Sequence, residues 1–245
     1  MPNLKKKIYK SALIVIGNEI LSGRTEDKNI GYVAKRLSEV GIRLSEVRIV
    51  PDIKEEIISS VTHCSNLYDY VFTTGGIGPT HDDITSESVS AAFGLENVLN
   101  EEAYKLLLDH YGDKKEINES RIRMAYMPEG CSLIKNSVSK APGFKINNVM
   151  VLAGVPLVMQ AMFESALSKL PAGLPVKSIE IDAKLPEGAI AEGLEKIQNK
   201  FSDVEIGSYP YYTEGKAGTV LVLSSVEGLQ LEKAVKDVKL LIETS

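Results

Sequence analysis

The sequence of 245 residues lacks tryptophan, has only two cysteines and contains no long uninterrupted apolar run. A membrane-spanning helix needs about 18 consecutive apolar residues, so none is expected. Cys64 and Cys131 are too few for a disulfide framework and lack the spacing of a metal site, so we expect reduced thiols in a cytoplasmic protein. The basic segment at residues 5–7 is followed by no small-residue cleavage site, so we expect no signal peptide.

Basic residues are outnumbered by acidic ones, at 28 Lys and Arg against 33 Asp and Glu, for a net charge of −5. The part beyond residue 172 holds eight bases, twelve acids and no arginine. Nucleic-acid binders concentrate Lys and Arg on one face, so we expect no nucleic-acid partner. The hydrophobic content of 44% is ample for a folded core, which excludes a disordered chain.

The first half of the chain alternates strand patterns with helix patterns. Residues 11–16 form a continuous apolar run, typical of a strand buried on both faces, and strands are also expected at 42–50 and 69–74. Helical spacing covers residues 27–41, and Asp52 with Glu55 resembles a capping box for the next helix. This alternation is typical of βαβ crossovers, so we predict an α/β domain with a mostly parallel sheet.

After the third expected strand, the sequence predicts one hairpin and several helices. A hairpin is expected at 145–152, around Asn147 and Asn148. The further helices predicted from spacing lie at 84–93, 101–111, 117–127 and 156–170.

A short Pro/Gly-rich linker at residues 171–175 separates two periodic segments. We therefore predict two domains, at residues 1–172 and 173–245. The second has the order β-α-β-β-α, typical of a small α+β plait. Its Gly215–Gly218 segment is similar to the GxxG loop of RNA-binding KH domains, but strand patterns on both sides favour a hairpin turn.

The most informative segment is the loop that follows the third predicted strand, Gly75-Gly76-Ile77-Gly78-Pro79-Thr80-His81-Asp82-Asp83. Glycines let backbone N–H groups approach a ligand, and a helix is expected to begin near Asp83. The loop lacks the Gly-Lys-Ser/Thr of a P-loop and the third glycine of a dinucleotide fingerprint. The adjacent acids Asp82 and Asp83 repel each other, which an Mg²⁺-like ion shared with a substrate phosphate would relieve.

Simpler interpretations of these residues remain open. The glycines also suit a tight turn, and Asp83 suits a helix cap. Glu19, in the loop after the first strand, either faces the Asp pair across the sheet edge or is an exposed surface acid. Ser22, Thr25 and Asn29 are caps or ligand donors with equal plausibility. His81 either contacts phosphate or is an exposed loop histidine.

The loop at 75–85 resembles the signature of the MoaB/Mog-like fold of molybdenum-cofactor biosynthesis, and its Gly-Pro-Thr-His-Asp-Asp form is similar to the N-terminal domain of competence/damage-inducible protein A (CinA). Three further blocks match in order: Gly17–Gly23, Ala141–Phe144 and Gly154–Pro156. The resemblance implies a three-layer αβα domain with a small second domain, in a short form without the amidase domain of CinA. It also implies a homo-oligomer.

Members of this superfamily bind molybdopterin or adenylated molybdopterin, and the CinA type cleaves the pyrophosphate of ADP-ribose-like dinucleotides. The resemblance therefore implies a phosphate-bearing ligand over the glycine loop, with a divalent metal (Mg²⁺, Mn²⁺ or Co²⁺) and K⁺; no haem, flavin or pyridoxal phosphate is expected. It implies Asp82, Asp83 and Glu19 as catalytic residues, the first two as metal ligands. The implied ligand-binding residues are Asn18, Ser22, Thr74, Gly75, Gly76, Gly78, Pro79, Thr80, Thr85, Pro142, Gly143, Gly154 and Pro156.

The chain departs from the family pattern at two positions. Val158 stands where the fourth block usually has Glu, so no carboxylate is available there, and Asn18 replaces an Asp common in pterin-binding relatives. Three hypotheses follow: a metal-assisted nucleotide pyrophosphatase, a non-catalytic binder of molybdopterin-like ligands, and an assembly module. Fold similarity alone does not decide between them.

Overall fold

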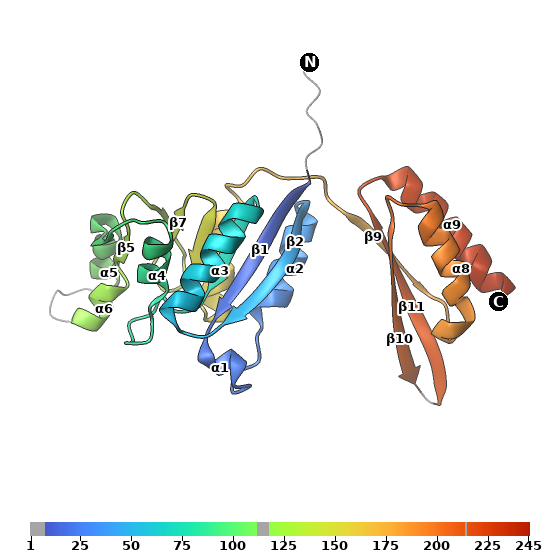
Figure 1. Cartoon of the computed structure of the whole chain (residues 1–245), viewed down its shortest axis with the longest axis horizontal. Coiled ribbons are helices and arrows are strands. Elements are labelled where there is room, and N and C mark those ends of the chain that lie inside the picture. The colour runs from blue at the N-terminus through green and yellow to red at the C-terminus, as the bar shows by residue number, and fades with distance from the viewer. Residues whose placement is uncertain (1–7, 112–117, 214) are drawn as a thin grey trace, which may run out of the picture. The chain divides into compact units, whose positions relative to one another are not determined.

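The computed structural model describes residues 8–111, 118–213 and 215–245. The chain divides into two compact units, Met1–Gly173 and Leu174–Ser245. Each unit has its own sheet and its own buried core (Figure 1). In the described residues, no helix is both long and apolar enough to cross a lipid bilayer.

The first unit is built on a central sheet of six described strands. In their order across the sheet, these are β2 (Ile42–Val50), β1 (Tyr9–Ile16), β3 (Tyr70–Thr74), β8 (Val149–Leu152), β7 (Gly143–Ile146) and β6 (Ser132–Ile134). The first four run parallel, whereas β7 and β6 are antiparallel to their neighbours. The prediction of a mostly parallel sheet is thus confirmed, as is the hairpin that β7 and β8 form.

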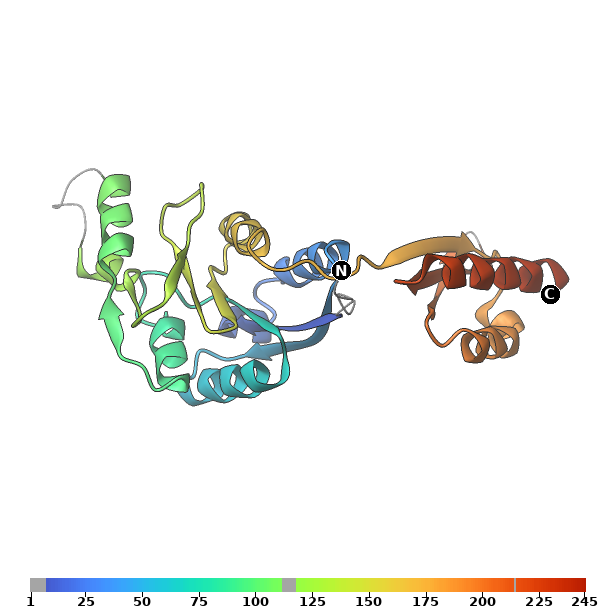
Figure 2. The same ribbon diagram turned by 90° about the horizontal axis from the view of Figure 1, so that it is seen from above.

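Helices cover both faces of this sheet, which gives the predicted three layers. The helices of the first unit are α1 (Asn18–Leu21), α2 (Asn29–Glu39), α3 (Lys54–Leu67), α4 (Thr85–Ala92), α5 (Glu101–Tyr111), α6 (Glu119–Arg123) and α7 (Pro156–Leu167). Figure 2 shows α2 and α7 on one side of the sheet, with α3 and α4 on the other. A separate two-stranded ladder joins β4 (Asn97–Leu99) to β5 (Tyr126–Pro128).

The side chains of β1 alternate between these two layers. Leu13 and Val15 pack into the core under α2 and α7, while Ala12, Ile14 and Ile16 join the core under α3 and α4. Because both faces of the strand are covered, its sequence is apolar throughout instead of alternating with polar residues. The continuous apolar run therefore corresponds to a central strand.

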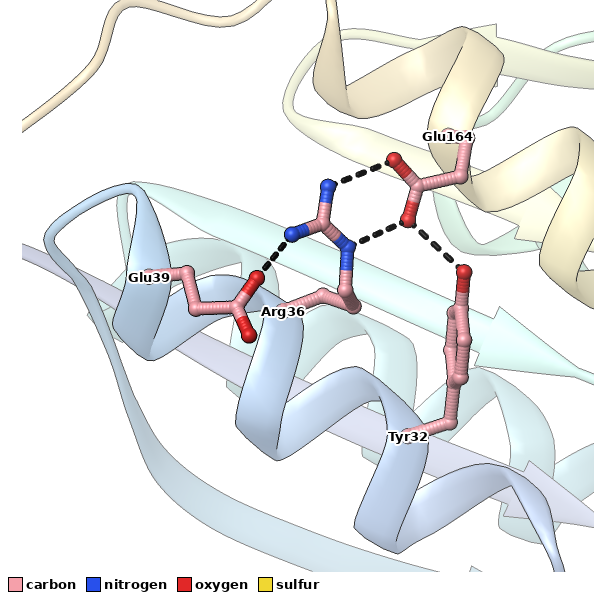
Figure 3. A network of polar contacts seen from close by, with 4 residues as sticks. All are labelled: Tyr32, Arg36, Glu39 and Glu164. Carbon is pink, nitrogen blue, oxygen red and sulfur yellow. Dashed lines mark hydrogen bonds and ion pairs between the residues drawn. The ribbon is translucent and has the colours of Figure 1, made fainter.

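A half-exposed polar network joins the two helices on one face of the sheet (Figure 3). Arg36 of α2 donates from Nε and Nη2 to the two carboxylate oxygens of Glu164 on α7, at 2.7 and 2.8 Å. The Tyr32 hydroxyl donates to Glu164 at 2.8 Å, and Arg36 also contacts Glu39. Arg36 lowers the pKa of Glu164, and burial, with Glu164 beside it, raises the pKa of Tyr32.

Two local predictions were wrong. The helix expected at 117–127 is only the five-residue α6, and the following residues pair as β5; residues 112–117 lie outside the described part. The expected capping box is also missing, because α3 has Ile53 at its N-cap and no side-chain cap bond. Asp52 instead accepts a hydrogen bond from the backbone of the first loop.

The second unit pairs three strands with two helices. They are β9 (Lys177–Asp182), α8 (Glu187–Lys200), β10 (Glu205–Thr213), β11 (Lys216–Ser225) and α9 (Gly228–Thr244). The strands are antiparallel in the order β10-β11-β9. Leu221 and Leu223 of β11 are buried with both helices in one core, so the predicted small α+β plait is confirmed.

Candidate functional site at the carboxyl ends of the parallel strands

The four parallel strands end side by side, and the loops that follow them form one edge of the first unit, which we call the strand edge. Residues 17, 51, 75 and 153 follow the ends of β1, β2, β3 and β8. β7 runs the opposite way, so the segment leading into it, with Pro142, reaches the same edge. All four sequence blocks of the family pattern therefore meet there, although they are far apart in the sequence.

The centre of the strand edge is a tight turn that we call the Gly turn, residues 75–78. Gly75 and Gly76 have φ of 100° and 67°, a region that favours glycine. A Cβ on Gly75 would lie 2.1 Å from the carbonyl oxygen of Ile16, and one on Gly154 would lie 3.2 Å from the Gly75 Cα. The backbones after β1, β3 and β8 therefore pack without room for side chains.

Thr85 holds the Gly turn from the first residue of α4. Its hydroxyl donates to the Gly75 carbonyl and its N–H donates to the Gly76 carbonyl, both at 3.0 Å. Thr85 is fully buried, so it fixes the turn and presents no free group at the surface. A Cβ on Gly76 would lie 2.1 Å from this hydroxyl, which explains glycine at that position.

Several polar groups of the strand edge have no partner within the described part of the chain. The N–H groups of Gly76, Ile77 and Gly78 donate to no described residue, and all three residues are partly exposed. The buried Thr74 hydroxyl and the Oδ1 of Asn29 likewise pair with no described atom, although Asn29 Nδ2 donates to the Gly154 carbonyl at 2.9 Å. Successive unpaired N–H groups in a turn make an anion-binding concavity.

The two adjacent acids of the loop differ in their surroundings. Asp83 Oδ2 accepts from the N–H and the hydroxyl of Thr80, at 2.7 and 2.6 Å. Asp83 therefore closes the loop instead of capping α4, whose N-cap is Ile84 with no side-chain bond. Asp82 is exposed, and the hydroxyl of Thr80, with the backbone N–H of Asp82 itself, lowers its pKa.

Asp52 is a carboxylate of the strand edge that our sequence analysis missed. It follows β2, it is half-buried, and its Oδ2 accepts from the Asn18 N–H at 2.9 Å. Burial raises the pKa of Asp52, whereas the hydrogen bond from the Asn18 N–H lowers it. The negative charges of Glu19, Asp82 and Asp83 raise it further. The signal was present in the sequence, because parallel strands that are neighbours end at the same edge.

The remaining predicted residues lie around this centre. The carboxylate of Glu19 folds back toward Gly17, 2.6 Å from where a Cβ would stand. Ser22 donates to the Glu19 carbonyl at 3.3 Å and lies with Asn18 in the exposed first loop. The other predicted residues are Gly78 and Pro79 in the loop after β3, Pro142 and Gly143 at the start of β7, and Pro156 at the first position of α7.

The carboxylates of the strand edge suit a divalent ion whose remaining ligands come from a bound phosphate and water. Among the residues that the structure describes, no three His, Cys, Asp or Glu side chains stand close enough to hold one ion. Mg²⁺ is usually bound by one or two carboxylates together with water and substrate phosphate oxygens. Asp52 and Asp82, one half-buried and one exposed, are carboxylates of the strand edge that could supply one or two such ligands.

Comparison with known proteins matches each of the two units to a known family. The family model for a probable molybdopterin binding domain matches residues 12–172, and the model for the middle domain of FAD synthase matches residues 175–245. The crystal structure of a CinA protein of unknown function from Thermoplasma acidophilum superimposes with a TM-score of 0.62 at 30% identity, over 65% of this chain and 96% of that one.

Two relatives extend the comparison along the sequence. A protein of Archaeoglobus fulgidus is 36% identical over 93% of this chain and 94% of its own length. A CinA-like protein of Thermosipho melanesiensis is 30% identical over 84% of this chain but only 53% of its own length. This chain thus corresponds to about half of the longer CinA-like protein.

A three-layer α/β domain with a glycine turn and acids at the carboxyl ends of its strands is the architecture of a small-molecule binding domain. The chain belongs to the family of probable molybdopterin binding domains, with a MoaB/Mog-like first unit of the CinA N-terminal type.

Proposed function

We propose that this protein is a metal-dependent pyrophosphatase that cleaves an ADP-ribose-like dinucleotide at the strand edge. The observation that carries the proposal is the juxtaposition of the unpaired N–H groups of Gly76, Ile77 and Gly78 with the carboxylates of three neighbouring loops. Backbone donors suit phosphate oxygens, and carboxylates suit a cation that bridges them. None of the residues predicted to bind the ligand is a Lys or Arg, so backbone donors and a cation take the place of basic side chains in this proposal.

In this proposal the chain binds and orients the pyrophosphate through the Gly turn. The turn is held by Thr85 before any ligand arrives, so its donors need little reorganisation during the reaction. A divalent ion bound beside Asp82 and Asp83 would neutralise phosphate charge and favour ionisation of a water molecule. Asp52 and Glu19 lie beside the proposed metal ligands, and we assign to this pair of carboxylates the role of accepting the proton of the attacking water.

The test is hydrolysis of ADP-ribose or FAD with Mg²⁺, Mn²⁺ or Co²⁺ and K⁺, followed by detection of AMP. We expect Asp82→Asn and Asp83→Asn to reduce turnover by about a hundredfold or more, the range for loss of a charge-stabilising group. Asp109→Asn on α5 removes the same charge from an exposed position outside the loops that follow the parallel strands, and serves as the matched control. Absence of turnover with every metal, on folded protein, would refute the proposal.

A second candidate function is non-catalytic binding of molybdopterin or an adenylated pterin, which the matching family model favours. In that case the Gly turn contributes affinity only. Calorimetry with a pterin phosphate separates the two: binding without hydrolysis, unaffected by Asp82→Asn, supports the binding protein. Both candidate functions involve binding of a small phosphate-bearing ligand. We also propose that the protein is a homo-oligomer, as the resemblance implies.

A further inference from the structure

A pocket of about 460 Å³ lies between α6 and residues 79–81, which directly follow the Gly turn, and we call it the α6 pocket. Residues 79–81 form one wall, and Asn118, Ser120, Arg121 and Arg123 form the other. These two segments are about forty residues apart in the sequence, and neither arginine belongs to the family blocks. The volume of the α6 pocket is within the range of small-molecule sites, which is about 300–1,000 Å³.

Apart from Pro79, the described residues that line the α6 pocket all carry hydrogen-bond donors, and none of them is an acid. Arg121 and Arg123 supply two guanidinium groups, and His81 and Ser120 add an imidazole and a hydroxyl. The sequence has few arginines, and none lies beyond residue 123, so two around one pocket is a marked local concentration. Two described acids border the loop wall: Asp82 Oδ1 lies 4.0 Å from His81 Nδ1, and Asp83 Oδ2 accepts from the Thr80 N–H at 2.7 Å.

The arginine side of the pocket is held in place by local contacts. The Arg121 guanidinium lies 4.2 Å from the centre of the Tyr111 ring, and Asn118 Oδ1 accepts from the Arg121 N–H at 3.0 Å. Arg123 is exposed and makes no ion pair with any described residue. The forked guanidinium group matches the oxygens of a phosphate better than an ammonium group does.

We propose that the α6 pocket is an anion subsite, which binds a phosphoryl group of a ligand that extends to it from the Gly turn. The continuity of the two sites through Pro79 and Thr80 is what carries this inference. It rests on the proposed function for the identity of the ligand, but not for hydrolysis. In this proposal one phosphoryl group of a diphosphate binds at the Gly turn and the other in the α6 pocket, whereas a monophosphate occupies one site, so the subsite favours pyrophosphate compounds over nucleoside monophosphates.

The test is calorimetric titration of the full chain with inorganic pyrophosphate, ADP-ribose and AMP. We expect Arg123→Gln to weaken ADP-ribose and pyrophosphate about tenfold, the range for a charge-assisted hydrogen bond, and AMP much less. The salt dependence of binding should also become shallower. Lys105→Gln removes a charge from an exposed position of neighbouring α5 and should change these affinities less than twofold.

Arg121→Lys gives a second variant, which keeps the charge and loses the fork. It should weaken pyrophosphate severalfold, and its thermal unfolding curve shows whether α6 is intact. Unchanged affinities in Arg123→Gln and Arg121→Lys overturn the subsite, and so does wild-type protein that binds none of the three probes.

The outcome is separable from that of the proposed function. Wild-type protein that hydrolyses nothing, but whose ADP-ribose affinity falls in Arg123→Gln, refutes the pyrophosphatase and supports the subsite. Hydrolysis that depends on Asp83, with KM for ADP-ribose unchanged in Arg123→Gln, supports the pyrophosphatase and overturns the subsite.

Discussion

Replacing Gly75 by alanine tests whether the backbone of the strand edge is as closely packed as the structure indicates. Gly75 has φ of 100°, and positive φ costs an alanine about 1–2 kcal/mol. The new Cβ would also lie 2.1 Å from the Ile16 carbonyl oxygen, which is backbone of a buried strand and cannot rotate away. Forcing such a group into a packed site costs about 1–3 kcal/mol more. We therefore expect Gly75→Ala to lower the free energy of unfolding of the first unit by about 2–5 kcal/mol.

Gly23→Ala is the matched control, because the backbone there is also at positive φ, 70°, but a Cβ would meet nothing within 4 Å. It should cost only the conformational part, about 1–2 kcal/mol. The difference between the two losses in the free energy of unfolding measures the cost of the close contact between the ends of β1 and β3.

Native-state hydrogen exchange of the amides of β3 is the suitable assay. This strand pairs on both sides within the sheet, so its amides report the opening of the first unit without a contribution from the second. Equal losses for the two variants would refute the close approach at Gly75. Gly75→Ala should also weaken pyrophosphate binding, since the Gly turn must move to accommodate the methyl group.

Two further variants test contacts away from the strand edge. Glu164→Gln removes the ion pair with Arg36 and should cost about 1 kcal/mol, because the network is half exposed. The lowered pKa of Glu164 means that its contribution is complete above the ordinary glutamate pKa of about 4.3 and is lost as pH falls through the lowered value. The raised pKa of Tyr32 means that its contribution to stability is complete below a pH of about 10 and is lost as pH rises through the raised value. Denaturant unfolding at several pH values should therefore show a constant difference from wild type between these limits; a difference that persists at pH 2 would contradict the assignment. Asn148→Ala removes two hydrogen bonds, of 2.9 and 2.8 Å, that the side-chain amide donates to backbone carbonyls near the end of α3. The free energy of unfolding should fall by about 1–3 kcal/mol in the same assay. A loss within error of zero would show that these hydrogen bonds do not stabilise the hairpin.

Much of the fold could be predicted from hydrophobic patterns. The apolar run of β1, the helical spacing of α2 and the hairpin around Asn147 each depend on residues close together in the sequence, so a local pattern was sufficient. The prediction failed where a local signal had a non-local partner. Asp52 has the spacing of a helix cap, yet its carboxylate pairs with Asn18 from another loop. Residues after 123 have a helical pattern, yet Tyr126–Pro128 pairs with β4.

The sequence alone determined the class of domain, because the Gly turn, the acid pair and the order of the four blocks are properties of short segments. Only the tertiary structure decided which groups at the strand edge are available. It showed that the hydroxyl of Thr85 and one carboxylate oxygen of Asp83 are used within the loop. It also brought Asp52 beside the other acids and Arg123 beside the loop tip. Strand order and helix packing set these distances, and both depend on burial of the whole chain and not on any one segment.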